Sequence, residues 1–357
     1  MIKSCYIHIP FCKNICSYCD FCKMYYNKDF VDKYLLSLEK EINLYYKNDL
    51  LNTLYIGGGT PSCLDEISLK KLFKIINIFK LNKTYEFTFE CNIEDINEKL
   101  LIFLKENKVN RISIGLQSFN KKYIEFMNRK YLNKKEITDK INLVKKYFNN
   151  INIDLIYGIN NETLKELQEE VDSFINLDVN HISLYSLILE DNTILKTKKY
   201  KEIDDDLNRK MYDYIRKTLK KNNYIHYEIS NFSKKGYMSK HNLCYWNNDN
   251  YYGFGLGSSG FIENIRYTNT RSLNSYINGN YRYYEEKIDK NRNMEYEMIL
   301  NLRKIKGISK KKFYKKYNLN IKDVFDVSKL KENKYYFYIP KKYLFVENYI
   351  LSDFILD

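Results

Sequence analysis

Proline and tryptophan are scarce in this chain of 357 residues, which contains three prolines and one tryptophan. Long hydrophobic runs are missing, because no stretch approaches the roughly 20 consecutive apolar residues of a membrane-spanning helix. The N-terminus also lacks the basic, apolar and small-residue regions of a signal peptide. From these absences we expect a cytoplasmic globular protein that neither spans a membrane nor is secreted.

Basic residues outnumber acidic ones, with 59 Lys and Arg against 45 Asp and Glu, which gives a formal net charge of +14. Such a charge can indicate a nucleic-acid partner. The lysines are spread along the whole chain, however, and no basic cluster with interleaved aromatics forms a platform for stacking bases. With 36 tyrosines as well, the composition is typical of an AT-rich genome, and we do not expect nucleic acid as a partner.

Short β-rich runs alternate with amphipathic helical stretches through the first 190 residues. The pattern predicts six strands, at residues 5–9, 53–56, 84–89, 111–115, 152–157 and 181–187. Strands that alternate with helices form a parallel sheet, so we expect an α/β fold with a partial (β/α)6 barrel. Functional residues should then lie at the carboxyl ends of the strands. Unusual residues cluster there: His8, residues 57–60, Glu90, Gln117 and Asp154.

The alternation ends after Leu189, and we expect three domains. Residues 1–190 form the partial barrel, residues 191–290 extend it, and residues 291–357 form a small α+β module of winged-helix type. Within the second part, residues 240–260 are rich in Asn, Tyr and Gly and are expected to be irregular. In the third part we expect two helices, a hairpin of strands at 335–339 and 343–346, and a closing helix.

Eight cysteines occur, and four of them lie close together: Cys12, Cys16, Cys19 and Cys22. A cytosolic chain of this size needs no disulfide bonds for stability, so clustered thiols indicate a metal or redox site. The spacing Cys12-x3-Cys16-x2-Cys19 follows the first strand directly. Three thiolates can hold three irons of a [4Fe–4S] cluster and leave the fourth iron open. A structural zinc site would need a second ligand pair, which the sequence lacks.

This spacing and the residues around it resemble the radical S-adenosylmethionine (SAM) superfamily. Further motifs are YIHIPFC at 6–12, IGGGTPS at 56–62, NRISIGLQSF at 110–119, NIDLIYG at 152–158 and HNLCYW at 241–246. Together they resemble the coproporphyrinogen dehydrogenase-like family, and most closely its haem-chaperone branch. Dehydrogenases of that family place a further cysteine where Phe21 stands here, and they carry a long extension before the position of Tyr6. We interpret Cys22 as a spare thiol, with a role as fourth ligand as the alternative.

The resemblance implies a role for each matching residue. The cluster ligands would be Cys12, Cys16 and Cys19. Contacts to SAM would come from Tyr6, Tyr18, Gly58, Gly59, Thr60, Glu90, Gln117, Arg129, Asp154 and Ile188. In this arrangement the glycine turn approaches the amino group of SAM, and a guanidinium pairs with its carboxylate. The alternatives are ordinary polar residues at strand ends, core aromatics and a surface arginine.

The HNLCYW stretch resembles the segment associated with haem in the chaperone branch. Imidazole is a usual haem ligand, so His241 is a candidate haem contact. Cys244 is a second candidate, as a thiolate ligand, and a purely structural role for His241 stays open.

The resemblance implies a cytosolic haem chaperone that binds a [4Fe–4S] cluster, SAM and haem, and that passes haem to an acceptor protein. The alternative is an oxygen-independent coproporphyrinogen III dehydrogenase of porphyrin biosynthesis, which would use SAM-derived radical chemistry to decarboxylate propionates. Whether the chain is an enzyme therefore stays open. Expected partners are haem, a haem-acceptor protein and an electron donor for the cluster, with peripheral membrane contact only through the acceptor.

Overall fold

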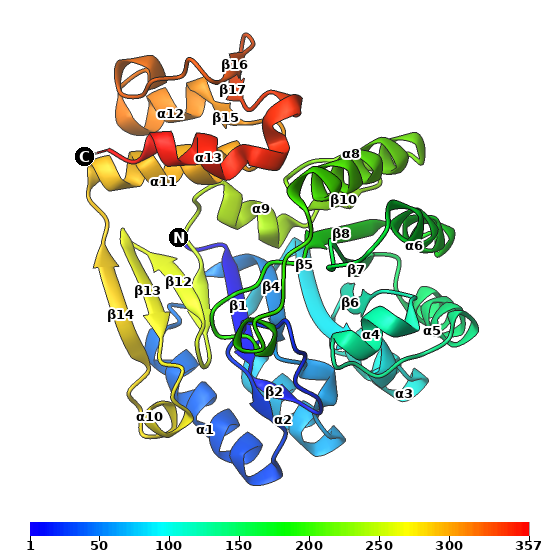
Figure 1. The fold of residues 1–357 in the computed structure, drawn as a ribbon. Coiled ribbons are helices and arrows are strands. Elements are labelled where there is room, and N and C mark those ends of the chain that lie inside the picture. The colour runs from blue at the N-terminus through cyan, green and yellow to red at the C-terminus, as the bar shows by residue number, and fades with distance from the viewer. Residues whose placement is uncertain (357) are drawn as a thin grey trace.

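The structure, a computed structural model, describes residues 1–356. Its centre is a nine-stranded sheet in the order β11-β1-β4-β5-β6-β7-β8-β10-β9 (Figure 1). Six consecutive parallel strands in this sheet are β1 (Ser4–Ile9), β4 (Leu50–Gly58), β5 (Lys80–Asn92), β6 (Arg111–Gln117), β7 (Ile151–Tyr157) and β8 (His181–Ser186). These are the six strands that the sequence predicts, so the α/β class and the parallel barrel sheet are confirmed.

Amphipathic helices connect these strands, as Figure 1 shows. They are α1 (Lys28–Tyr45), α2 (Glu66–Ile76), α3 (Glu98–Glu106), α4 (Lys121–Phe126), α5 (Lys134–Tyr147) and α6 (Leu164–Asn176). Each of them begins after an Asn, Asp or Thr whose side chain accepts a hydrogen bond from the first turn. Helix α1 buries Tyr34, Leu38 and Ile42 at helical spacing. Capping and periodicity together explain why the helical segments could be predicted.

Later segments complete both edges of the sheet. At one edge β10 (Asn231–Ser233) is antiparallel to β8, and β9 (Ile225–His226) pairs with β10 after helices α7 (Ile194–Thr197) and α8 (Asp205–Lys221). At the other edge β11 (Tyr252–Phe254) lies parallel to β1. The expectation that residues 240–260 are irregular is therefore wrong, because they contain β11 and the helix α9 (Lys240–Trp246). Gly253 serves close packing here: a Cβ would lie 1.9 Å from the carbonyl oxygen of Ser259.

Two small sheets flank the central one. The first joins β12 (Ser259–Ile262), β13 (Ile265–Asn269) and β14 (Arg282–Lys287) around helix α10 (Leu273–Ile277). The second belongs to a C-terminal module and has the order β15 (Ile308–Ser309), β17 (Tyr336–Tyr338) and β16 (Lys331–Glu332). The helices of this module are α11 (Lys290–Leu302), α12 (Lys310–Tyr317) and α13 (Glu347–Leu351).

The C-terminal module departs from the sequence expectation at one strand. Residues Lys341–Val346 form a 3₁₀ helix and not the predicted second strand of a hairpin. Only Leu344 of this segment is buried, so its β-prone residues have no sheet face to cover. A small C-terminal α+β module is nevertheless present, while the division of the chain at residues 190 and 290 stays a prediction. Within residues 1–356, no helix has the length and apolar character needed to cross a membrane.

Candidate cluster and cofactor site

A cavity of about 450 Å³ lies at the carboxyl ends of the parallel strands. Its wall includes the ends of β4, β5, β6 and β8 and the loop that follows β1. The three cysteines of the motif, Cys12, Cys16 and Cys19, all line it. Most of the strand-end residues expected to gather line it as well, namely Gly58, Gly59, Thr60, Glu90, Gln117 and Asp154, whereas His8 and Gly57 do not.

The cysteine loop is fastened at several points. The short strand β2 (Phe11–Cys12) pairs with β3 (Met24–Tyr25), which closes the loop at its base. At its far side, the N–H of Ser17 donates to the carbonyl oxygen of Met127 at 3.1 Å. These bonds hold the backbone of the loop in one conformation, in which the three thiols line the cavity.

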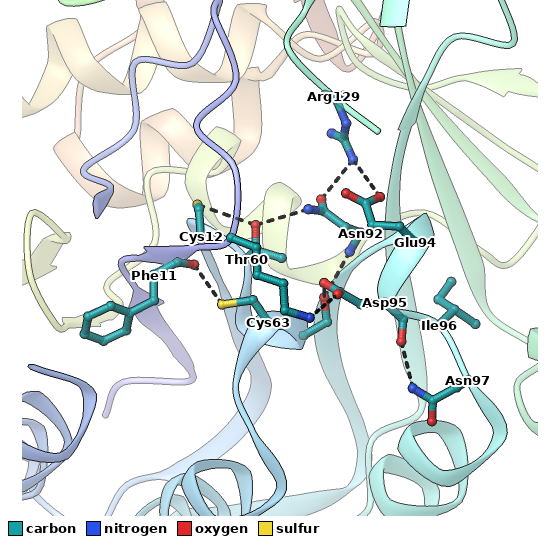
Figure 2. A network of polar contacts seen from close by, with 12 residues as sticks. Phe11, Cys12, Thr60, Cys63, Asn92, Glu94, Asp95, Ile96, Asn97 and Arg129 are labelled. Atoms are coloured by element: carbon teal, nitrogen blue, oxygen red, sulfur yellow. Dashed lines mark hydrogen bonds and ion pairs between the residues drawn. The ribbon is translucent and has the colours of Figure 1, made fainter. Parts of the chain in front are cut away.

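The thiols themselves are suited to metal-bound thiolates. Burial raises the pKa of Cys12 to about 11, and burial also raises the pKa of Cys19. Without a cation the thiols are therefore protonated, whereas bound iron would stabilise the thiolate. Thr60 donates to Cys12 Sγ at 3.5 Å and orients it, as Figure 2 shows. Within residues 1–356, no three His, Cys, Asp or Glu side chains are placed to hold a single metal ion.

Cys22 is separated from the other three thiols. It is buried, its Sγ lies 4.0 Å from the carbonyl oxygen of Arg271, and it does not line the cavity. Its own carbonyl oxygen lies 2.6 Å from His8 Nε2. Phe21, in contrast, lines the cavity and is 65% exposed. This arrangement matches the interpretation of Cys22 as a spare thiol, although the ligand set itself stays a prediction.

The glycine turn at the end of β4 packs directly against the cysteine loop. Gly58 has a φ of +117°, and a Cβ there would lie 2.6 Å from Nδ1 of His8. A Cβ on Gly59 would lie 2.9 Å from Cys12 Sγ. The turn therefore requires residues without side chains, because any Cβ would fill the space beside the cluster loop.

Arg129 lies in the wall of the cavity, 6% exposed, and its Nη1 lies 3.5 Å from the hydroxyl of Tyr18 on the cysteine loop. Its Nη2 donates to Asn92 Oδ1 at 3.0 Å and to the carbonyl oxygen of Gly115 at 2.9 Å, and lies 3.6 Å from Glu94 Oε2. Figure 2 shows Asn92 between Arg129 and Thr60, so that the arginine is connected to the cysteine loop through two side chains. The guanidinium is thus held in place at the cavity wall, where it can pair with a ligand carboxylate.

Two half-buried carboxyl groups face the cavity. Glu90 accepts from the Tyr55 hydroxyl at 2.5 Å and from the N–H of Gly58 at 3.0 Å, and burial raises its pKa to about 7. Asp154 accepts from Asn152 Nδ2 at 2.8 Å, and burial raises its pKa as well. Both groups are held by neutral donors and retain the capacity to accept from hydroxyl groups such as those of a ribose.

Gln117 is the third polar residue predicted here. It ends β6 with a φ of +71°, and its Oε1 is buried without a hydrogen-bond partner. A buried amide oxygen without a partner is costly, so it indicates a ligand donor that is not part of the chain. The site therefore has the acceptors that SAM hydroxyl and amino groups require.

The remaining predicted residues divide into two groups. Tyr18 and Ile188 line the cavity, with Ile188 61% exposed at its rim. Tyr6 does not line the cavity, and its hydroxyl contacts His8 Nδ1 at 2.9 Å behind the wall. His241 is 1% exposed and does not line the cavity either, although its neighbour Asn242 does.

Both ring nitrogens of His241 are already engaged. Nδ1 lies 2.8 Å from Thr53 Oγ1 and Nε2 lies 2.7 Å from the Tyr245 hydroxyl. Burial lowers the pKa of His241 to about 3, so the ring is neutral. In this structure the imidazole therefore has the environment of a structural histidine, and a haem contact would need one of these bonds to break.

Several residues of the cavity were not singled out in the sequence analysis, among them Tyr55, Asn92 and Arg111. The sequence held a signal for one of them. Counting back from Gln117 in steps of two along β6 places Arg111 on the same face of the strand.

Comparison with known proteins shows the family of this chain. The sequence model of the radical SAM superfamily matches residues 6–174. The haem chaperone HemW of Lactococcus lactis is 38% identical, over 90% of this chain and 87% of the relative. HemW of Bacillus subtilis is also 38% identical, over 91% of this chain and 89% of the relative.

The coproporphyrinogen III oxidase HemN of Escherichia coli has a similar fold, with a TM-score of 0.86. The alignment covers 99% of this chain and 90% of that one at 20% identity, a likeness that concerns the fold alone. The radical SAM superfamily implies a [4Fe–4S] cluster and SAM, and the thiols, acceptors and guanidinium of the cavity fit both. The resemblance inferred from the motifs is confirmed: the chain belongs to the HemW family of haem chaperones within the radical SAM superfamily.

Proposed function

We propose that this chain binds haem and transfers it to an acceptor protein, with a [4Fe–4S] cluster and SAM held in the cavity. The observation that carries this function is the 38% identity to HemW haem chaperones over nine tenths of the chain. We further propose a cytoplasmic location, an electron donor for the cluster, and membrane contact only through the acceptor.

The cluster would be held by Cys12, Cys16 and Cys19. When bound, the cluster supplies an open iron to which the amino acid part of SAM can attach. The chain contributes a fixed loop, a hydrogen bond from Thr60 to Cys12 Sγ, and burial of Cys12, which is 6% exposed. Such burial excludes water from the sulfur that lies against the glycine turn.

SAM would lie between the glycine turn and the far wall. Arg129 would pair with its carboxylate, and Glu90, Asp154 and Gln117 would accept from its ribose and amino groups; all four residues line the cavity, and Gln117 Oε1 has no partner within the chain. Tyr18 and Ile188 would border its methionine and adenine portions, respectively. Tyr6 would act indirectly, by fixing His8 beneath the glycine turn.

His241 stays our candidate haem contact within the HNLCYW helix, and it can bind iron only if one of its ring nitrogens is released. Tyr245 lies one helical turn away and occupies Nε2, so release of this hydroxyl would free a ring nitrogen for iron. Haem binding through His241 should then depend on Tyr245: a Tyr245→Phe variant, which removes the hydroxyl, should bind haem at least as tightly.

One experiment separates chaperone from dehydrogenase. Anaerobically reconstituted protein is given haem, or is given coproporphyrinogen III with SAM and a reductant. We expect stable haem uptake at a fixed ratio per chain and no porphyrinogen turnover. Formation of protoporphyrinogen with matching amounts of methionine and CO2 would contradict the chaperone function and establish the dehydrogenase.

A further inference from the structure

Arg111 is a deeply buried cation without a partner in the wall of the cavity. The residue is 2% exposed, yet it is among those that line the cavity. Its Nε is buried without a hydrogen-bond partner, and within residues 1–356 no carboxylate forms an ion pair with its guanidinium. Buried arginines are normally paired because the charge is costly to remove from water. Burial raises the pKa of Glu90 and Asp154 and the charge of Arg111 helps to lower it, but neither carboxyl group forms an ion pair with Arg111, so the guanidinium can still bind an anionic ligand.

Its position separates it from the proposed SAM contacts. Arg111 begins β6 and Gln117 ends it, so their Cα atoms are roughly 20 Å apart along an extended strand. Side chains of alternate residues share one face of a strand, and Arg111, Ser113 and Gln117 all line the cavity. Arg111 thus belongs to a deeper compartment than the strand ends where Gly58 and Gln117 lie.

The polar neighbours in this compartment are already bonded to one another. Asn152 Nδ2 donates to Ser113 Oγ at 2.9 Å and to Asp154 Oδ1 at 2.8 Å. Asn152 Oδ1 accepts from Ser183 Oγ at 3.1 Å and lies 2.6 Å from Nδ1 of His181. These side chains therefore bond to one another and not to the guanidinium, whose donors stay directed to the cavity.

The other cations of the cavity, unlike Arg111, donate hydrogen bonds to acceptors within the chain. Lys23 donates to the carbonyl oxygen of Cys19, and Arg129 donates to Asn92 and Gly115. One unpaired guanidinium beside Glu90 and Asp154 suits a monoanion better than a phosphate dianion, because the two carboxyl groups oppose additional negative charge. A planar carboxylate also matches the fork of the guanidinium in shape.

We propose that Arg111 anchors a second carboxylate-binding subsite in the depth of the cavity, distinct from Arg129, which would pair with the carboxylate of SAM. The carboxylate is a propionate of haem, which rests on the proposed function, or a small free carboxylate. The rim of the same cavity fits the first source. Phe21, Ile188 and Tyr185 are 65%, 61% and 43% exposed there, and an apolar macrocycle could cover them.

Full-length protein with its cluster reconstituted tests the subsite by titration with haem, haem dimethyl ester and sodium propionate. The ester lacks the carboxylates and keeps the macrocycle. We expect the wild type to bind haem roughly 10- to 100-fold more tightly than the ester, the range of one charge-assisted hydrogen bond. Arg111→Met should lose this preference and leave ester binding unchanged, and Arg111→Lys should retain part of it. Arg216→Met is the control, because Arg216 pairs with Asp213 outside the cavity.

Thermal unfolding separates a ligand site from a structural charge. Because the unpaired charge is costly in the ligand-free protein, Arg111→Met should raise Tm. Propionate should raise Tm of the wild type and not of this variant. A lower Tm for Arg111→Met, with no effect of propionate on the wild type and no preference for haem over its ester, would overturn the proposal.

The outcomes also distinguish the two sources of the carboxylate. A propionate effect without preference for haem over its ester supports the subsite with a free carboxylate as its ligand. If the wild type binds neither haem nor its ester, the proposed haem function fails, and the propionate arm still decides the role of Arg111.

Discussion

Replacing Gly59 with alanine should disrupt the cysteine loop by steric contact alone. The φ of Gly59 is not in the left-handed region, so the added methyl group causes no backbone strain of its own. It would, however, lie 2.9 Å from Cys12 Sγ and equally close to the backbone of Phe11 and Pro10. Two of these three contacts are main-chain atoms, which cannot move aside by rotating a side chain.

The expected cost follows from the distances. Non-bonded carbon atoms are comfortable at about 3.5–4.0 Å, so the cysteine loop must move away by about 0.5–1 Å. Overpacking of this kind costs about 1–3 kcal/mol. Gly279 provides the control: it has a φ of +86° and a Cβ there would meet nothing within 4 Å. Gly279→Ala should therefore cost about 1–2 kcal/mol from backbone strain and leave Cys12 undisturbed.

The two variants are compared by iron and sulfide content after anaerobic reconstitution, and by urea unfolding before it. We expect Gly59→Ala to lose most of its iron and Gly279→Ala to keep the wild-type amount, although both are destabilised. Equal iron in the two variants would refute the reasoning, because it would mean that the turn does not determine where Cys12 lies.

Three further predictions concern the thiols, pH and the arginine wall. Cys16→Ala should abolish cluster iron, whereas Cys22→Ala should keep it, because Cys16 lines the cavity and Cys22 does not. Equal iron loss in both variants would show that the ligand assignment is wrong. Burial raises the pKa of Glu228 to about 7 from 4.5, so the folded chain holds a proton that the unfolded chain releases. Stability should therefore fall by up to about 1.4 kcal/mol per pH unit between these values, and Glu228→Gln should flatten the fall in urea titrations; an unchanged slope would contradict this. Arg129→Lys should weaken SAM binding about tenfold or more, because lysine cannot form a bidentate pair with a carboxylate; equal affinity measured by calorimetry would remove Arg129 from the site.

The strands of the barrel could be predicted because their signals are local. Each combines a short apolar run with a following helix, and both periods are visible within about 20 residues. Strand β11 carries no such signal: it has three residues, and its partner β1 lies some 245 residues earlier in the chain. The glycines around it suggested irregular backbone, whereas Gly253 is needed for close contact with Ser259. Whether such a segment forms a strand depends on pairing with residues far away in the chain, and this pairing cannot be read from a single sequence.

The same distinction explains which site residues could be found. Residues at strand ends could be placed together, since the topology of a parallel sheet brings its carboxyl ends to one edge. Whether a side chain has a partner is a different question, which depends on residues far apart in sequence. His241 looks available as a ligand within its motif, yet Thr53 from β4 occupies one of its ring nitrogens. Arg111 looks like an ordinary charged residue at the start of a strand, yet none of its neighbours pairs with it.

These two residues also indicate how a haem chaperone could be built on this scaffold. The helix α9 carries His241 on its buried side and Asn242 on the side that lines the cavity. Movement of α9 would therefore change the cavity wall and the hydrogen bonds of His241 together. A carboxylate bound at Arg111 would lie in the same cavity as Asn242.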